Sequence, residues 1–281
     1  MKIITTTDEL HQYTASLPHG AEVGLVPTMG YLHAGHLQLV KAARRENSHV
    51  VVSIFVNPTQ FGPHEDLDRY PRDRARDQNL LCAEGVDCVF APEVEEVYSA
   101  GFATYVEVEG ALGSYWEAQS RPGHLRGVAT VVAKLFNLVR PNRAYFGQKD
   151  AQQLAVIRRV EKDLNLRVQV CSVPTVRDDD GLALSSRNTY LSPAEREAAT
   201  VLYRSFQRAE AIIKDGERNA RRIEEAVSGM IALEERARLD YVAMVDAETF
   251  ERQGLLKQPA LLLLAVWVGS TRLIDNWWLE V

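Results

Sequence analysis

The chain of 281 residues contains little of what secreted and membrane proteins need. Its three cysteines (Cys82, Cys88 and Cys171) are scattered and odd in number, which argues against a disulfide framework and suits a reducing compartment. The longest apolar run, Ala260 to Val268, is too short to span a bilayer. The first residues show no apolar core or cleavage signature of a leader peptide. These absences predict a cytoplasmic protein that does not enter a membrane.

An excess of positive charge is also missing. The 32 Lys and Arg residues are outnumbered by 38 Asp and Glu residues, which gives a formal net charge of −6. We therefore expect no nucleic-acid partner, and anionic substrates must be attracted by local groups rather than by the overall field. No internal repeat or low-complexity segment is present. The length suits one large α/β domain, or a main domain with a smaller one.

The stretch that organises the chain is Pro-Thr-Met-Gly-Tyr-Leu-His-Ala-Gly-His, residues 27–36. It follows the apolar run 23–26, which predicts a short buried strand, and it precedes residues 37–43, whose apolar positions recur at helical spacing. We expect a strand, a turn, and a helix that begins near His36. The free N–H groups at such a helix start attract anions, phosphate above all.

Two histidines and two glycines strengthen this interpretation. His33 and His36 stand three residues apart, on one side of the helix start, where they can donate to phosphate oxygens and at least one can carry charge. Gly30 and Gly35 leave room for a nucleotide against the backbone. A zinc site is disfavoured, because no Cys-x-x-Cys pair is present and the spacing is not that of zinc proteases. His-x-Gly-His is often incidental, but its place after the first apolar strand favours a nucleotide site.

The rest of the chain predicts alternating strands and helices, followed by a smaller domain. Asn57 and Gln60 follow the β-branched run 50–56 and can hydrogen-bond a small polar substrate, although an ordinary turn explains them equally well. The predicted helices are one with Thr7 as N-cap, the charged segment 66–82, and 128–139; further strands are expected at 87–90, 144–147 and 167–173. A composition change at 191–193 places the boundary between domains 1–190 and 191–281. The second domain should contain helices at 193–214 and 219–238 and strands at 239–245, 260–268 and 277–281.

Two residues have open roles at this point. His124 lies in a loop of glycine, proline and two arginines at a helix entrance, where it can meet an anion or simply pack. Asp77 belongs to a charge run that predicts a solvated helix face, but its carboxylate can also help to hold magnesium.

Five short sequence motifs in a fixed order resemble those of a known family. They are residues 27–30 (Pro-Thr-Met-Gly), 55–61 (Phe-Val-Asn-Pro-Thr-Gln-Phe), 70–72 (Tyr-Pro-Arg), 146–150 (Phe-Gly-Gln-Lys-Asp) and 184–188 (Leu-Ser-Ser-Arg-Asn), and the likeness continues to 272–276 (Arg-Leu-Ile-Asp-Asn). With the His-x-Gly-His signature, they make the chain similar to the pantoate–β-alanine ligases of the nucleotidyltransferase superfamily related to class I aminoacyl-tRNA synthetases.

The resemblance implies a fold and a reaction. The fold class would be α/β: a Rossmann-like parallel sheet that binds the nucleotide, with a smaller C-terminal α+β domain that closes over it. The reaction would join pantoate to β-alanine with ATP through a pantoyl adenylate, with Mg²⁺ arriving on ATP and no metal site of the protein's own. It also implies a cytoplasmic homodimer.

The resemblance further implies roles for individual residues. His36 is expected as the main acid-type catalyst, with His33 and Lys149 beside it. Gln60 and Gln153 would bind pantoate, and Gln60 also β-alanine. The residues expected to contact ATP are Met29, Gly30, Tyr31, Leu32, His33, Ala34, Gly35, His36, Gly147, Gln148, Lys149, Asp150, Val176, Leu184, Ser185, Ser186 and Arg187.

The segment 184–187 departs from the lysine-containing signature loop of class I synthetases, since it offers two hydroxyls and a guanidinium instead. That set can still clamp phosphate. Two rivals remain: a nucleotidyltransferase that acts on a phosphorylated cosubstrate, and a non-catalytic nucleotide-binding module. Neutral Gln60 and Gln153 disfavour the first, and the full set of histidines, lysine and serines disfavours the second.

Overall fold

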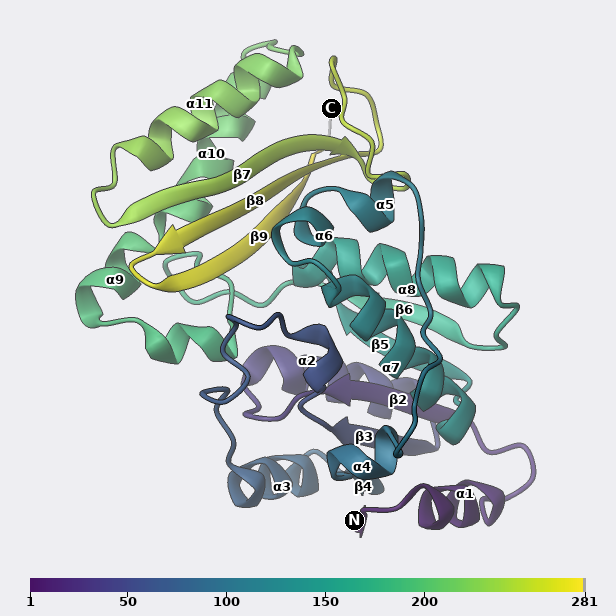
Figure 1. The fold of residues 1–281 in the computed structure, drawn as a ribbon. Helices are drawn as coiled ribbons and strands as arrows, with labels where there is room; N and C mark the ends of the chain where they lie inside the picture. Colours follow the sequence, from purple (N-terminus) through teal and green to yellow (C-terminus); the bar gives the residue numbers. More distant parts are fainter. Residues whose placement is uncertain (280–281) are drawn as a thin grey trace. The chain divides into compact units, whose positions relative to one another are not determined.

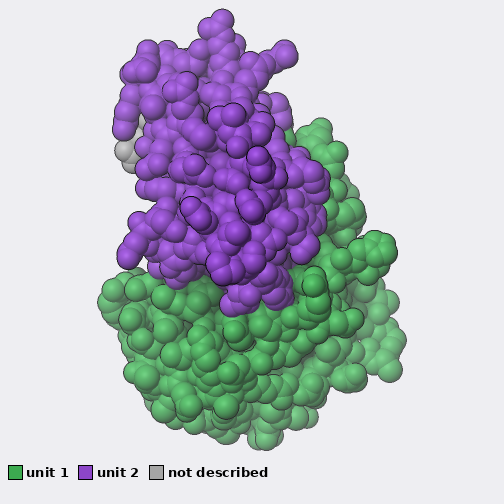
Figure 2. Space-filling view, turned by 90° about the vertical axis from the view of Figure 1, so that its left-hand side faces the viewer, with its two compact units in different colours: residues 1–148, 152–174 green, residues 149–151, 175–281 purple. Residues whose placement is uncertain are grey.

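A computed structural model describes residues 1–279 of the chain. The chain forms two compact units, which Figure 2 shows in different colours. Unit 1 consists of residues 1–148 and 152–174, and unit 2 consists of residues 149–151 and the chain from Thr175 onward. The main part of unit 2 begins at Thr175, which is nearer the amino terminus than the domain boundary predicted at 190–191. No helix within residues 1–279 is long and apolar enough to cross a membrane.

Unit 1 is built on a six-stranded parallel sheet with the order β1-β4-β3-β2-β5-β6 (Figure 1). Its strands are β1 (Lys2–Ile4), β2 (Val23–Thr28), β3 (His49–Ile54), β4 (Cys88–Phe90), β5 (Arg143–Gly147) and β6 (Gln169–Val173). The helices along this part of the chain are α1 (Thr7–Ala15), α2 (Ala34–Glu46), α3 (Arg74–Ala83), α4 (Val94–Val97), α5 (Ala111–Ser114), α6 (Glu117–Ser120), α7 (His124–Val139) and α8 (Ala151–Asp163). Short 3-10 turns η1 (Pro58–Gln60) and η2 (Gln148–Asp150) follow β3 and β5. The predicted α/β class is confirmed.

Both faces of this sheet are buried. Leu25 of β2 and Val51 of β3 belong to a core with residues of α1, α7 and α8. Val26 and Val52, the next residues along the same strands, belong to a second core with residues of α2 and α3. Successive side chains of a strand point to opposite faces, so a strand covered on both sides needs apolar residues throughout. This explains why β2 and β3 stand out as unbroken apolar runs.

The starts of α1 and α3 differ from the prediction, and α7 begins at His124, ahead of the predicted range 128–139. Thr6, not Thr7, is the N-cap of α1, and its hydroxyl accepts from the Glu9 N–H at 3.3 Å. The helix predicted over 66–82 is wrong in its first half, because residues 66–73 are not helical and α3 begins only at Arg74. Pro71 disfavours helical backbone at the residue before it, and the Asp73 side chain caps α3 through the Arg76 N–H. The strand β1 was not expected.

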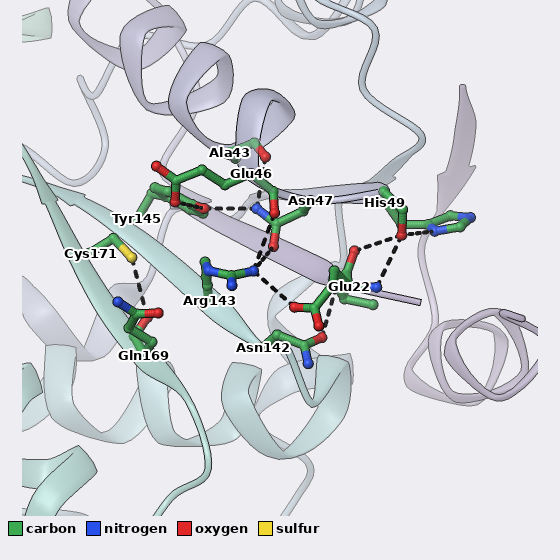
Figure 3. A network of polar contacts seen from close by, with 12 residues as sticks. Glu22, Ala43, Glu46, Asn47, His49, Asn142, Arg143, Tyr145, Gln169 and Cys171 are labelled. Atoms are coloured by element: carbon green, nitrogen blue, oxygen red, sulfur yellow. Dashed lines mark hydrogen bonds and ion pairs between the residues drawn. The ribbon is translucent and has the colours of Figure 1, made fainter. Parts of the chain in front are cut away.

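A polar network at the amino ends of the strands fastens α2 to the sheet (Figure 3). Asn47, directly after α2, donates through Nδ2 to the Ala43 carbonyl and to the Tyr145 hydroxyl, each at 2.7 Å. That hydroxyl donates in turn to Glu46 Oε2 at 2.8 Å. Burial, followed by the hydrogen bond to Glu46, raises the pKa of Tyr145, so the hydroxyl stays protonated as the network requires. The network lies at the sheet edge opposite to the predicted site.

Unit 2 is built on an antiparallel sheet in the order β7 (Ala237–Asp246), β8 (Ala260–Val268) and β9 (Thr271–Leu279). Its helices are α9 (Pro193–Ala198), α10 (Val201–Lys214) and α11 (Ala220–Ala232), preceded by the 3-10 turn η3 (Ser186–Tyr190). The α+β prediction is confirmed. The helix predicted over 193–214 is divided after Ala198, and the one predicted to reach 238 ends at Ala232. The last predicted strand begins earlier, at Thr271, and its residues 280–281 lie outside the described part.

The start of α7 packs closely under η1. A Cβ atom on Gly127 would lie 2.4 Å from the Thr59 carbonyl oxygen, so only glycine allows this approach. One turn earlier, His124 Nδ1 lies 2.9 Å from the Gln60 carbonyl oxygen, and its Nε2 lies 3.0 Å from Arg121 NH1. A carbonyl only accepts and a guanidinium only donates, which assigns the proton of a neutral ring to Nδ1. Of its two open roles, His124 has the packing role.

Protonation of His124 should destabilise the fold. Burial, reinforced by the Arg121 charge, lowers the pKa of His124 from 6.5 to about 4. An unfolded chain therefore binds a proton that the folded chain refuses, and stability falls as the pH drops from about 6.5 to about 4. The shift corresponds to a loss on the order of 3 kcal/mol. Urea unfolding of the wild type and His124→Gln across this range should show two curves that converge at low pH, and parallel curves would contradict the assignment.

Candidate active site

Three neighbouring strands end at one edge of the sheet, and each is followed by a segment predicted to bind substrate. β2 lies between β3 and β5, and all three are parallel, so their carboxyl ends share that edge. After β2 the chain first forms β3 and β4 on one side of β2, and it later forms β5 and β6 on the other side. Open α/β sheets bind ligands at the point where the strand order reverses in this way.

The turn after β2 has a left-handed backbone that a buried carboxylate holds in place. Gly30 has φ 82° and Tyr31 has φ 49°. Asp77 of α3 is 1% exposed, and its oxygens accept from the N–H groups of Tyr31 at 2.7 Å and of Leu32 at 2.8 Å. Left-handed backbone is unfavourable for a residue such as tyrosine, so these two hydrogen bonds offset its cost. The solvated position predicted for Asp77 is therefore wrong, and its role in shaping the loop was not predicted.

The two histidines form a reciprocal cap at the start of α2. His33 is the N-cap, and its Nδ1 accepts from the Gly35 N–H at 3.1 Å. His36 Nδ1 accepts from the His33 N–H at 3.3 Å, and the two ring centroids lie 4.0 Å apart. Because Nδ1 accepts in both rings, a neutral imidazole with its proton on Nε2 fits each position. The helix begins at Ala34, two residues before the predicted start, since His33 itself supplies the cap.

The glycines of the loop serve its own packing. A Cβ atom on Gly35 would lie 2.9 Å from His33 Cε1, and one on Gly30 would lie 3.1 Å from Asp77 Oδ2. We expected these glycines to leave room for a nucleotide. That expectation stays a prediction, and the structure adds that they also leave room for the capping ring and for the carboxylate that holds the turn.

Gln60 joins the end of β3 to the loop after β2. It is 7% exposed, its Oε1 accepts from Asn57 Nδ2 at 3.0 Å, and its Nε2 lies 3.0 Å from Met29 Sδ. Asn57 is itself held, since its Oδ1 accepts from the Tyr98 hydroxyl at 2.8 Å. The predicted substrate residue Gln60 and the predicted ATP residue Met29 are therefore in contact.

The neighbouring glutamines of α8 differ in what they do. Gln152 is 3% exposed and ties down the segment before α7: its Nε2 donates to the Leu112 and Tyr115 carbonyls, and its Oε1 accepts from the Glu117 N–H. Gln153, the predicted pantoate residue, is half-buried. Its predicted role toward pantoate stays a prediction.

The predicted phosphate residues of unit 2 come from two short turns. Lys149 and Asp150 lie in η2, with Lys149 Nζ 3.8 Å from Asp150 Oδ1. Ser185 is the N-cap of η3 and its hydroxyl accepts from the Arg187 N–H at 3.3 Å, while the adjacent Ser186 is buried. The hydroxyl of Ser185 keeps its own proton for donation, because in this cap it is an acceptor.

Residues 176–184 form a small hairpin ahead of these serines. The Leu184 N–H donates to the Val176 carbonyl at 2.9 Å, and the Asp178 N–H donates to the Leu182 carbonyl at 2.9 Å. Val176 and Leu184, both predicted at the nucleotide, are thus paired with each other. Within unit 1, Met29 contacts Gln60 and His33 contacts His36. Unit 2 contains the hairpin, η3 and the Lys149 turn.

Comparisons with known proteins identify the family. The model of the pantoate-beta-alanine ligase family matches residues 2–278. Pantothenate synthetase of Carboxydothermus hydrogenoformans is 53% identical over 282 residues, which cover 100% of both chains. The crystal structure of pantothenate synthetase from Thermus thermophilus superposes with a TM-score of 0.94 at 52% identity, over 99% of both chains.

A third relative was solved with ligands. Pantoate-beta-alanine ligase from Francisella tularensis, complexed with beta-gamma ATP and β-alanine, superposes with a TM-score of 0.84 at 33% identity over 99% of this chain and 97% of its own. The family model and the relatives of high identity both extend over essentially the whole sequence. The chain belongs to the pantoate-beta-alanine ligase family.

Proposed function

We propose that this protein condenses pantoate with β-alanine at the expense of ATP, giving pantothenate, AMP and pyrophosphate through a pantoyl adenylate. The observation that carries the proposal is the contact between Gln60 and Met29, which joins a neutral amide after β3 to the capped histidine loop. The relatives named pantothenate synthetase support the reaction, and the complex of the Francisella enzyme supports ATP and β-alanine as its ligands.

In the first step a pantoate carboxylate oxygen attacks the α-phosphorus of ATP. The bond from that phosphorus to the β-phosphate oxygen breaks, and pyrophosphate leaves with the electron pair. Such a transfer needs positioning and charge stabilisation rather than a covalent catalyst. His36 is the main acid-type catalyst and His33 acts beside it, each donating from Nε2 because Nδ1 is used in the cap.

Further groups bind the nucleotide. Lys149, Ser185, Ser186 and Arg187 bind the β- and γ-phosphates by charge and hydroxyl donation. The backbone of Val176 and the adjoining residues binds the adenosine part. The remaining proposed ATP contacts are Met29, Gly30, Tyr31, Leu32, Ala34, Gly35, Gly147, Gln148, Asp150 and Leu184.

In the second step the amine of β-alanine attacks the acyl carbon of the adenylate, and AMP leaves. Gln60 contributes to both steps, since it binds the pantoate part and lies beside the β-alanine position. Gln153 binds pantoate from α8. Amides suit a hydroxy acid because they offer both donors and acceptors without charge.

Magnesium enters with ATP, where it neutralises charge on the phosphates. This ion keeps several waters and is usually bound through substrate phosphates and one or two carboxylates. Asp77, whose carboxylate was considered for magnesium, accepts a backbone N–H on each of its oxygens. Residues 1–279 contain no group of three or more His, Cys, Asp or Glu that could hold a metal. We further propose that the protein acts as a cytoplasmic homodimer, as the family resemblance implies.

One assay separates this proposal from its rivals. A nucleotidyltransferase with a phosphorylated cosubstrate, or a module that only binds nucleotide, would not release pyrophosphate in response to pantoate. Pyrophosphate release from ATP should begin only when pantoate is added, before β-alanine is present.

His36→Ala should lower pyrophosphate release by roughly 10²–10³, the usual effect of removing one preorganised donor. Thermal unfolding should show that the variant still folds. His19→Ala, an exposed histidine before the amino end of β2, is the matched control and should keep wild-type activity. Near-normal release by His36→Ala would remove this residue from catalysis.

Lys149→Ala should damage the first half-reaction far more than the second. Its proposed partner is the departing pyrophosphate, which has left before β-alanine attacks. Purified pantoyl adenylate with β-alanine measures the second half alone, and Lys162→Ala on the exposed end of α8 is the control. Equal damage to both halves would mean that Lys149 serves the acyl group or the fold.

Gln60→Ala should weaken the use of pantoate by roughly tenfold to a hundredfold and leave ATP binding nearly unchanged. A buried partner left unpaired costs on the order of 1–3 kcal/mol, and 1.4 kcal/mol is a factor of ten. Isothermal titration with ATP and steady-state kinetics in pantoate measure the two effects separately. An equal fall in ATP affinity would place Gln60 in the nucleotide site instead.

A further inference from the structure

The Asp-Asn pair near the end of the chain has no role in the reaction as proposed, yet both residues are buried. Asp275 is 3% exposed and Asn276 is 4% exposed, and they are consecutive residues of β9. A carboxylate and an amide seldom lie inside a protein unless their hydrogen bonds are satisfied. Their partners therefore show what the two residues do.

Asp275 fastens the hairpin 176–184 to β9. Its carboxylate receives both terminal nitrogens of Arg177, NH1 at 2.5 Å on Oδ2 and NH2 at 3.0 Å on Oδ1, which is a bidentate ion pair. Arg177 NH1 also donates to the Gly181 carbonyl at 3.0 Å, across the turn of the hairpin. The Arg177 guanidinium lies over the Trp277 ring, 5.2 Å from its centroid. The first residue of the hairpin, Val176, directly precedes this anchor.

Asn276 fastens the Lys149 turn to the same point of β9. Its Nδ2 donates to the Lys149 carbonyl at 2.7 Å, across 127 positions of sequence. Its own N–H donates to Asp275 Oδ1 at 2.8 Å, so the anchor of the hairpin also fixes the backbone of Asn276. The Lys149 side chain starts from the Cα atom next to that carbonyl.

We propose that Asp275 and Asn276 are positioning residues that fix Val176 and Lys149 relative to each other on β9. The inference rests on the proposed role of Lys149 at the phosphates and adds what sets its place. A flexible lysine reaches many points, whereas a main-chain carbonyl held at 2.7 Å limits where its Nζ can lie. A small displacement of a positioned charge can lower the rate of catalysis strongly.

The test compares Asn276→Asp and Asn276→Ala with the wild type in the two half-reactions. Aspartate keeps the shape but lacks the donor, and alanine removes the side chain. Pyrophosphate release should fall about tenfold, as expected for one lost hydrogen bond near 1.4 kcal/mol. The second half-reaction, started from purified pantoyl adenylate, should stay unchanged. Glu210→Ala is the matched control, because it removes the hydrogen bond of 2.7 Å from Trp277, the next residue of β9, and should leave both halves intact.

A double-mutant cycle with Lys149→Ala decides whether Asn276 acts through this lysine. If it does, Asn276→Ala should add little to the loss of Lys149→Ala, because no ammonium remains to be positioned. Undiminished loss in that background, equal loss in both half-reactions, or no loss at all would overturn the inference while leaving the role of Lys149 intact. Full activity of Lys149→Ala alone would instead overturn the proposed function of that residue. Thermal unfolding identifies a variant that fails to fold, and Asn276→Leu, which keeps the side-chain volume without a donor, then replaces alanine.

Discussion

Two N–H groups donated to one buried carboxylate set the path of the chain between β2 and α2. The turn contains two successive left-handed residues, Gly30 and Tyr31, and Asp77 receives the N–H groups of Tyr31 and Leu32. Without that acceptor, buried donors would be left unsatisfied beside a strained tyrosine. Because the turn determines where α2 begins, the same two hydrogen bonds place His33 as its cap and His36 one turn further along.

The cap then determines what the histidines can offer. Each ring uses Nδ1 as an acceptor for a backbone N–H, so each presents Nε2 as a donor. A helix start of this kind combines oriented N–H groups with the positive end of the helix dipole, and both favour phosphate. In the proposed reaction the protein needs no nucleophile of its own to activate a carboxylate through phosphorus, because the attacking group would belong to the substrate. Fixed donors at the phosphates are the contribution that remains for the protein.

Local patterns in the sequence predict much of this arrangement, and contacts across long sequence separations account for what they miss. The apolar runs of β2 and β3 are visible because both faces of the sheet are covered, and the glycines of the loop mark its turn. Asp77 lies 46 residues from Tyr31 in a charged segment that resembles an exposed helix face, so nothing local reveals its role. His124 likewise finds the Gln60 carbonyl across 64 residues. Two adjacent threonines could each cap α1. The hydroxyl of Thr6 is the cap, whereas that of Thr7 donates to Glu96, a distant contact that the local sequence does not reveal.

Long sequence separation between contacting residues also explains why the motif Arg-Leu-Ile-Asp-Asn suggests the family but, by itself, does not reveal the function of its residues. Its Asp275 and Asn276 hold Arg177 and the Lys149 carbonyl, so their effect lies entirely in segments 98 and 127 positions away. Asp77 and His124 act on backbone groups of the loop and of η1 in the same manner. Several of the residues proposed to bind a ligand, such as Lys149 and Ser185, lie on or beside short 3-10 turns. Buried polar residues from elsewhere in the sequence therefore have to fix those turns, and a family signature records such residues together with the ones that touch substrate.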